Sequence, residues 1–272
     1  WMSEPNGRSN IGLALKGRRK KWMIQGHIGS IWENGQYVRS RELEKVRPAF
    51  EDLLARLQTD YIDLGMIHFI DTKEEFDRVI NGEFMEYVRQ LKHEGKIRHI
   101  GMSTHNPETA RMAAKQGEIE MLLFSINPAF DMMPPVTDLE EYFAEAYDEK
   151  LRGIAPEREE LYKLCEQNQV GITVMKGYAG GRLFHAQTSP FGVALTPVQC
   201  LHYALTRPAV ASVMVGFDNP QHVAEAVAYE SASELEKDYA SVLAAAPSHA
   251  FSTGQCTYCG HCAPCPSKID IA

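Results

Sequence analysis

Short apolar runs alternate with helical stretches through most of this chain, and this alternation limits the possible fold more than any other feature. Six runs are nearly continuous in apolar residues: Trp22–His27, Ile62–His68, Ile97–Ser103, Met121–Ile126, Gly171–Met175 and Ala211–Val215. Strands with so few polar positions are typical of a sheet that is covered on both faces. The alternation therefore predicts an α/β fold built on a parallel sheet.

The stretches between these runs supply the crossover helices that parallel strands need. They are Arg41–Leu57, Phe84–His93, Pro107–Gln116, Glu157–Gln167, Pro197–Thr206 and Pro220–Tyr229. Proline is tolerated in the first turn of a helix, which suits the three stretches that begin with one. Pro48 lies inside the first stretch, so we expect a kink there or a later helix start.

Six βα units suit either an open doubly wound sheet or part of an eight-fold barrel. No glycine-rich dinucleotide fingerprint follows the early strands, which weakens the doubly wound alternative. We therefore expect a (β/α)8 barrel. The sequence opens abruptly at Trp1–Pro5, shortly before a helix-like segment at Ser9–Lys16, so the first two units of the barrel are expected to precede it. The barrel is predicted to occupy residues 1–245, and a small C-terminal segment residues 246–272.

Four cysteines lie close together in that C-terminal segment, at three-residue steps: Cys256, Cys259, Cys262 and Cys265. This spacing lets one tight loop place its thiolates around a 4Fe-4S cluster, and Pro266 after the last cysteine is typical of ferredoxin loops. Zinc is the alternative, although a structural zinc site normally takes two Cys-x-x-Cys pairs from separate places. The fourth ligand is less certain than the first three, and Cys200 is the other candidate for it.

The composition narrows the partners and the compartment. The net charge of -8 argues against nucleic acid as the main partner, because backbone phosphates need a basic surface. No window approaches eighteen consecutive apolar residues, so no membrane helix is predicted. The cysteines are clustered rather than spread as in a disulfide framework, which indicates a reducing cytoplasm.

Polar residues stand where several predicted strands end, which is where the chemistry of a βα barrel gathers. They are His27, His68, Ser103, Asn127 and Lys176. A neutral imidazole can donate a proton or a hydrogen bond to a carbonyl group, which makes the two histidines catalytic candidates. Asp71 follows His68 and could orient its ring or cap the next segment.

Two later loops could approach a phosphate group. Gly180 and Gly181 could bring backbone N–H groups close to it, with Arg182 as the counter-charge. The segment from Gly216 leads into a helix whose N-terminus would suit an anion. Asp218 has the wrong charge for a phosphate there, although it suits a helix cap.

Several of these stretches resemble the aldo/keto reductase family, and specifically its branch with a C-terminal ferredoxin-like cluster. The matching stretches are Ser9–Arg19, Leu57–Leu64, Met66–Asp71, Gly95–Ser103, Met175–Leu183 and the cysteine run. The resemblance implies a barrel that binds NADPH or NADH at its C-terminal face. It also implies hydride transfer to the aldehyde or ketone group of a small-molecule substrate.

The resemblance further implies roles for individual residues. His68 corresponds to the family's catalytic histidine, and His27 stands where the family has a catalytic lysine. Trp1 lies close to where the family's catalytic tyrosine would fall, and Asp218 where many members have a basic residue for the 2′-phosphate of NADPH. The residues expected near the cofactor are Ser103, Asn127, Lys176, Gly180, Gly181, Arg182, Gly216, Gln221 and Glu225.

Three functions remain open at this point. An iron–sulfur oxidoreductase with a nicotinamide cofactor is the preferred hypothesis. A one-electron version of this hypothesis would pass electrons singly through the cluster, and would need a flavin or another electron-transfer partner. Alternatively, the barrel has lost catalysis and keeps its cluster as a structural element or redox sensor, or the chain is a dedicated electron carrier.

Overall fold

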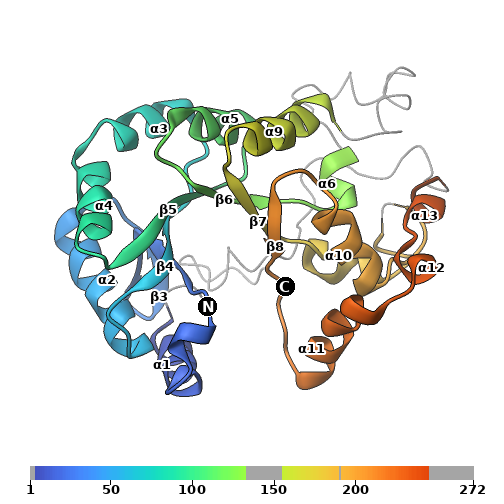
Figure 1. Ribbon diagram of the computed structural model, residues 1–272, viewed down its shortest axis with the longest axis horizontal. Coiled ribbons are helices and arrows are strands. Elements are labelled where there is room, and N and C mark those ends of the chain that lie inside the picture. The colour runs from blue at the N-terminus through green and yellow to red at the C-terminus, as the bar shows by residue number, and fades with distance from the viewer. Residues whose placement is uncertain (1–3, 133–154, 190, 245–272) are drawn as a thin grey trace. The chain divides into compact units, whose positions relative to one another are not determined.

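The computed structural model describes residues 4–132, 155–189 and 191–244 (Figure 1). They form two compact units. The first unit consists of the described residues up to Leu123 together with Asn168–Gly171, and the second of those from Phe124 to Gln167 and from Ile172 onward. The predicted boundary at residue 245 and the whole cysteine segment lie outside the described residues.

Three parallel strands form the centre of the first unit, in the order β1 (Gln25–Ile28), β4 (Ile62–Ile67) and β5 (Ile97–Thr104). All six residues of β4 are buried, as the continuous apolar run predicts. The helices of this unit lie along the outer side of these strands (Figure 1). They are α2 (Leu43–Leu57), α3 (Lys73–Ile80), α4 (Glu83–His93) and α5 (Pro107–Gln116).

Helix α1 (Pro5–Leu15) packs against α2, and a glycine sets how closely they approach. A Cβ atom added to Gly12 would lie 2.2 Å from the carbonyl oxygen of Arg56. The α2 side chains Val46, Phe50 and Leu53 form part of a buried stripe with helical spacing. Helix α2 begins at Leu43 rather than at the predicted Arg41, and this later start still leaves Pro48 inside the helix.

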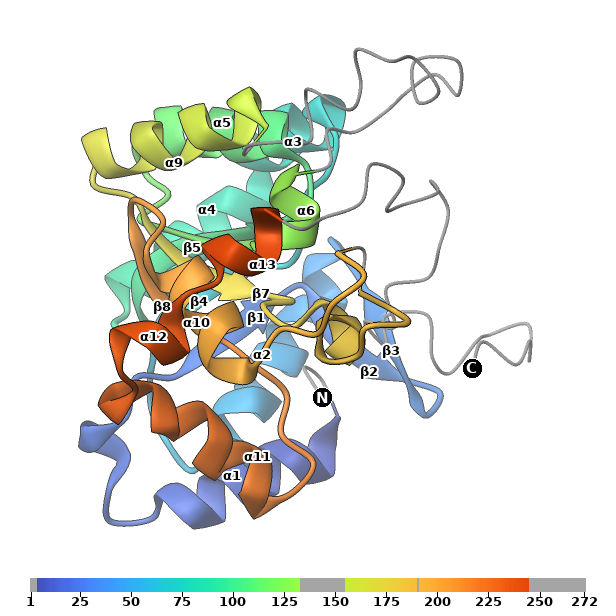
Figure 2. The same ribbon diagram turned by 90° about the vertical axis from the view of Figure 1, so that its right-hand side faces the viewer.

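A β-hairpin follows β1 and was not predicted. Its strands β2 (Ser30–Glu33) and β3 (Gln36–Arg39) are antiparallel and extend away from the strands of the first unit (Figure 2). Asn34 and Gly35 form the turn with φ angles of 54° and 78°. Positive φ at both central residues gives a turn whose twist matches that of the strands, which is why Asn-Gly is favoured there.

The second unit contains the parallel strands β7 (Gly171–Met175) and β8 (Val210–Val213), and β6 (Met121–Ser125) begins in the first unit and ends in the second. An apolar cluster that includes Leu183, Phe191 and Cys200 forms part of its core. Its remaining elements are α6 (Pro128–Met132), α9 (Pro156–Gln167), the 3-10 helix η2 (Ala179–Phe184), α10 (Pro197–Leu205), α11 (Pro220–Val227), η3 (Ala228–Ser231), α12 (Glu234–Lys237) and α13 (Ala240–Ala244).

The parallel strands and the helices between them confirm the predicted α/β class, with two local corrections. Strand β1 begins at Gln25 rather than Trp22, and the side chains of Trp22 and Met23 are 56% and 74% exposed. Strand β8 is only partly buried, so the expectation that every strand is covered on both faces is wrong for it. No helix in the described ranges is both long and apolar enough to cross a membrane.

Candidate active site

Two buried histidines contact each other at the ends of neighbouring strands. The backbone N–H of His68 continues the β1–β4 ladder by donating to the carbonyl of Ile28 at 2.9 Å, which brings His68 beside His27. Their Nδ1 atoms are 2.8 Å apart, and the rings meet edge to face with centroids 4.6 Å apart. His68 is 1% exposed and His27 9%. Because a neutral imidazole has one donor and one acceptor nitrogen, the tautomer of one ring determines that of the other.

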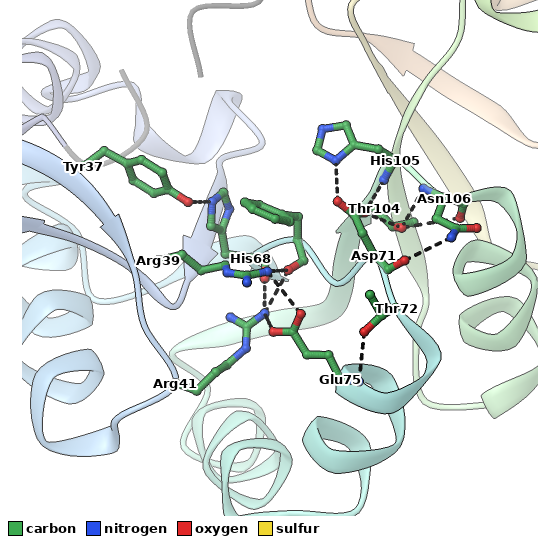
Figure 3. A network of polar contacts seen from close by, with 11 residues as sticks. Tyr37, Arg39, Arg41, His68, Asp71, Thr72, Glu75, Thr104, His105 and Asn106 are labelled. Carbon is green, nitrogen blue, oxygen red and sulfur yellow. Dashed lines mark hydrogen bonds and ion pairs between the residues drawn. The ribbon is translucent and has the colours of Figure 1, made fainter. Parts of the chain in front are cut away.

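Tyr37, from strand β3 of the hairpin, adds a third group to this pair. Its hydroxyl contacts Nε2 of His68 (Figure 3), and the two rings are 5.2 Å apart in an edge-to-face arrangement. Burial raises the pKa of Tyr37 to about 12, against the lowering effect of Arg39 and Arg41, so the phenol is protonated at neutral pH. Tyr37 was not among the residues predicted from the sequence.

Arginine residues tie the end of the hairpin to the segment that holds His68 (Figure 3). Arg41 donates through Nη2 to the carbonyl oxygens of His68 and Phe69, and Arg39 donates to that of Phe69 at 3.1 Å. Both guanidinium groups also pair with Glu75 of α3, each at 3.1 Å. Burial lowers the pKa of Arg41 to about 10, which still leaves it charged at neutral pH. The hairpin is therefore anchored at the site by charged groups.

Asp71 orients a different histidine from the one expected. It accepts hydrogen bonds from the backbone N–H of His105 at 2.7 Å, from Nδ1 of His105 at 3.0 Å and from Oγ1 of Thr104 at 3.0 Å (Figure 3). Asn106 donates to the backbone carbonyl of Asp71 at 3.0 Å. This cluster joins the segments that follow β4 and β5. Among the described residues, the Asp71 carboxylate makes no hydrogen bond to His68.

Ser103 lies in β5 and is 3% exposed. Its Oγ atom is buried and has no hydrogen-bond partner in the described part of the chain. A buried hydroxyl without a partner is costly, so such a group calls for an explanation, such as a bound ligand, an ion or a water molecule. This position suits a polar group of a bound ligand.

The other residues predicted near a cofactor belong to the second unit. The Asn127 amide is fully buried, donates to the Lys176 carbonyl at 2.9 Å and accepts from the Phe130 N–H at 2.9 Å. Lys176 itself is half-buried, with φ of 58°. Further along the chain, Gly180 and Gly181 lie in η2 with φ angles of 67° and 85°, a backbone conformation that favours glycine.

Three further predicted residues are exposed on or before α11: Gly216, Gln221 and Glu225. The amide of Gln221 donates to the carboxylate of Glu225 at 3.1 Å. Arg182 lies in η2 and is half-buried. The structure thus brings together His27 with His68, Asn127 with Lys176, and Gln221 with Glu225, while Ser103 belongs to the first unit.

A family model supplies the deciding observation, because the aldo/keto reductase family matches residues 5–199. The chain belongs to the aldo/keto reductase family. It is accordingly an oxidoreductase of this type, and the family uses NAD(P)H and acts on small-molecule substrates. An uncharacterized oxidoreductase of Bacillus subtilis, YqkF, is 25% identical over 236 residues, covering 84% of this chain and 74% of its own.

Solved aldo-keto reductases share the fold. AKR11C1 from Bacillus halodurans in its holo form matches 92% of this chain and 81% of its own, with a TM-score of 0.65 and 23% identity. An aldo/keto reductase from Klebsiella pneumoniae, solved in complex with NADP and acetate, matches 89% of this chain and 77% of its own, with a TM-score of 0.57 and 17% identity. The parallel α/β arrangement is consistent with the (β/α)8 barrel of the aldo/keto reductase fold.

The four cysteines predicted as cluster ligands in this aldo/keto reductase lie outside the described residues. Within the described ranges, no group of three or more His, Cys, Asp or Glu side chains is arranged to hold a metal ion. Cys200, the reserve candidate, is fully buried in the apolar cluster of the second unit. Burial raises the pKa of its thiol to about 12, which opposes formation of the thiolate that a metal requires.

Proposed function

We propose that this chain reduces the carbonyl group of a small-molecule substrate with NADPH or NADH, and that the paired histidines form its catalytic centre. The observation that carries this proposal is the buried contact between His68 and His27, where two strands end. His68 polarises the substrate carbonyl by donating a hydrogen bond from Nε2. His27 supports that donor by holding the proton on the required nitrogen of His68, since the two Nδ1 atoms share one hydrogen.

The residues expected around the cofactor support nicotinamide binding. A reduced nicotinamide, when bound, supplies hydride. In the first unit, the partnerless hydroxyl of Ser103 suits the polar carboxamide of such a ring. Asn127 of the second unit is proposed as a cofactor residue on the resemblance to the family alone. The positive-φ loop at Gly180 and Gly181 suits close approach of phosphates. Lys176, Arg182, Gly216, Gln221 and Glu225 complete the proposed set.

The choice between the two nucleotides depends on Asp218, whose carboxylate is 93% exposed. It stands where many relatives are expected to carry a cation for the 2′-phosphate. A carboxylate there would repel that phosphate, so the binding assay below uses both nucleotides.

The proposed reaction is tested by substituting His68 with glutamine, which keeps a polar side chain but has no titratable nitrogen. Oxidation of NADPH and NADH is followed by absorbance with a panel of small aldehydes and ketones, and nucleotide binding by fluorescence. We expect kcat to fall by about 10²-fold or more, the typical contribution of a general acid, with nucleotide affinity unchanged. The matched control is His93→Gln, because His93 is exposed at the end of α4.

Wild-type protein that binds neither nucleotide would contradict this proposal. If His68→Gln and His27→Gln left every measurable turnover unchanged, the barrel would instead be a scaffold with a structural or redox-sensing cluster.

We further propose that residues 246–272 form a segment that binds a 4Fe-4S cluster through Cys256, Cys259, Cys262 and Cys265, in a cytoplasmic protein whose barrel occupies residues 1–245. Their three-residue spacing supports this. The burial of Cys200 favours Cys265 as the fourth ligand. Such a cluster would call for an electron-transfer partner if it exchanges electrons with the barrel.

The cluster is tested by anaerobic reconstitution followed by absorption and electron paramagnetic resonance spectra. We expect a broad absorption band at about 400 nm that reduction with dithionite bleaches. Cys256→Ser should lose iron, while Cys200→Ala should retain it. Bound zinc without iron, or iron lost from Cys200→Ala, would contradict the assignment.

A further inference from the structure

We propose that the segment Lys16–Met23 docks this chain on the surface of a bilayer that contains anionic lipids. The segment connects α1 to β1 in the first unit, and it joins exposed cations directly to exposed apolar side chains. The proposal goes beyond the reductase function and uses no residue of the candidate active site. It concerns where the protein works rather than what it catalyses.

Positive charge is concentrated in this segment, although the whole chain has a net charge of -8. Between Glu4 and Glu33 the sequence has no acidic residue, and five of the six residues in Lys16–Lys21 are lysine or arginine. Four of these cations are exposed and form no ion pair with any part of the chain that the structure describes: Lys16, Arg18, Lys20 and Lys21. A charge distribution of this kind orients a protein with its basic segment toward an anionic surface.

The fifth cation, Arg19, points inward and fixes the shape of the segment. Its guanidinium group donates to the carboxylate of Asp63 and to the backbone carbonyl of Tyr61, both at 2.9 Å. It also donates to the carbonyl oxygen of Trp22 at 2.7 Å. The same Asp63 carboxylate accepts from the backbone N–H of Ile24 at 2.9 Å. A bilayer would therefore meet a segment that is already ordered, which lowers the entropic cost of binding.

Two large apolar side chains follow the cations directly. Trp22 is 56% exposed and Met23 is 74% exposed, although both belong to a run expected to be buried. Tryptophan is favoured at the boundary between water and lipid, because one part of its ring system is apolar and its N–H is polar. Cations beside exposed apolar side chains are typical of proteins that lie on a membrane surface.

Other occupants fit this segment less well. A second copy that used the same segment would bring like charges together. A nucleic acid would neutralise the cations but leave the side chain of Met23 in water. An acidic protein would have to offer fixed partners to four flexible cations, whereas lipid headgroups can move to meet them. The combination of charge and apolar surface therefore favours a bilayer.

The proposal is tested by sedimentation of the full chain with vesicles of phosphatidylcholine mixed with phosphatidylserine. Each Lys or Arg close to an anionic bilayer contributes about 1 kcal/mol, which is roughly fivefold in affinity. We expect the double variant Lys20→Gln with Lys21→Gln to bind these vesicles roughly 25-fold more weakly than wild type. Wild-type binding should weaken as salt is added, and it should be lost with vesicles of phosphatidylcholine alone.

The matched control is the double variant Arg78→Gln with Lys115→Gln. It removes the same charge from exposed positions on α3 and α5, and should keep the wild-type affinity for the vesicles. Equal losses in both double variants would mean that only net charge matters, and would overturn the docking role of this segment.

Tryptophan fluorescence reports directly on insertion. Emission from wild type should move to shorter wavelength when the mixed vesicles are added. Trp22→Phe should lose this shift, while Trp32→Phe should keep it, because Trp32 lies in β2 outside the segment. A shift that persists in Trp22→Phe would overturn the proposal.

Reductase activity without vesicles separates this proposal from the proposed function. The Lys20→Gln and Lys21→Gln pair should leave both turnover and the urea midpoint at their wild-type values, because the replaced side chains are exposed. Wild-type protein that ignores the mixed vesicles would refute the docking proposal and leave the reductase function intact. Binding to polyglutamate or DNA without binding to vesicles would also refute it, and would assign the segment to an acidic polymer.

Discussion

Replacing Asp131 with asparagine should destabilise the second unit strongly, because this carboxylate is fully buried at the centre of a polar network. Its Oδ1 atom accepts from Nε of Arg158 at 2.7 Å and from the Tyr162 hydroxyl at 2.6 Å, and Oδ2 accepts from the Tyr203 hydroxyl at 2.9 Å. Its backbone N–H donates to the Asn127 carbonyl at 3.0 Å. The network thus also supports one of the residues proposed to contact the cofactor.

The magnitude follows from what asparagine can and cannot replace. Asparagine keeps the size of aspartate and one acceptor oxygen, but its NH2 group cannot accept the hydrogen bonds made to the other carboxylate oxygen. The Arg158 side chain, which is only 7% exposed, is also left without a counter-charge. Removing one partner of a buried ion pair costs about 3–5 kcal/mol. We therefore expect Asp131→Asn to lower the free energy of unfolding by about 4 kcal/mol, a large part of the roughly 5–15 kcal/mol of a typical domain.

Urea unfolding followed by circular dichroism measures this loss. With a slope near 3 kcal/mol per molar urea, the midpoint should fall by roughly 1 M or more. The control is Asp77→Asn, which removes an exposed ion pair with Lys73 and should leave the urea midpoint almost unchanged. Because the double variant Asp131→Asn with Arg158→Met also removes the stranded charge, it should be more stable than Asp131→Asn alone.

A loss below about 1 kcal/mol for Asp131→Asn would refute this reasoning, because it would mean that the buried guanidinium needs no partner. So would a double variant whose loss equals the sum of the two single losses, since residues in one network should couple.

Two further predictions concern the first unit. Ser103→Ala should weaken nucleotide binding by about tenfold, which is the value of one hydrogen bond. The urea midpoint should stay unchanged or rise, because the Oγ atom of Ser103 has no partner within the described ranges. Unchanged nucleotide affinity in a binding titration would argue against the proposed role of Ser103. Burial alone would raise the pKa of Asp71, but the bonds from His105 and Thr104 outweigh it and hold that pKa below its ordinary 3.8. The Asp71 carboxylate therefore stabilises the fold above about pH 4, and this stabilisation is lost as the pH falls further. The difference in unfolding free energy between wild type and Asp71→Asn should accordingly become smaller in acid. A difference that stays constant with pH would contradict this prediction.

The central strands and helices were predictable because their signals are local. The buried runs at β4, β5 and β7 needed no tertiary information, and α5 has the predicted bounds, with Asn106 capping its start and Gly117 in the left-handed region at its end. The contact between His27 and His68 was also accessible, since parallel strands end at the same edge of a sheet.

The hairpin was missed although it carries a strong signal. Asn34-Gly35 between the short apolar stretches at Ile31 and Tyr37 indicates a two-residue turn. Helix α3 was missed in the same way, although Thr72 caps Glu75, a pair that marks a helix start. Both elements are short and half-exposed, so neither has the long apolar run that identified the others.

The contact of Tyr37 with His68 lies beyond local sequence signals. The turn fixes the register of the hairpin but not its direction, which depends on Arg39 and Arg41 finding backbone carbonyls about thirty positions along the chain. Charged side chains that bond to a distant backbone leave no periodic pattern, because the partner atoms are the same for every residue type. Residues of this kind become visible only once the fold is known.

The resemblance to the family implies that His27 stands in place of a lysine, and this bears on the proposed catalysis. An ammonium group can only donate hydrogen bonds, so a lysine beside Nδ1 of His68 would hold that ring in one tautomer. An imidazole can donate or accept, and the 2.8 Å contact therefore joins two rings that can exchange a proton. If catalysis had simply been lost, nothing would require both polar rings to stay buried at the strand ends, where each needs a partner to offset its lost hydration. The buried contact of the two histidines therefore favours the proposed reductase over a barrel that has lost catalysis.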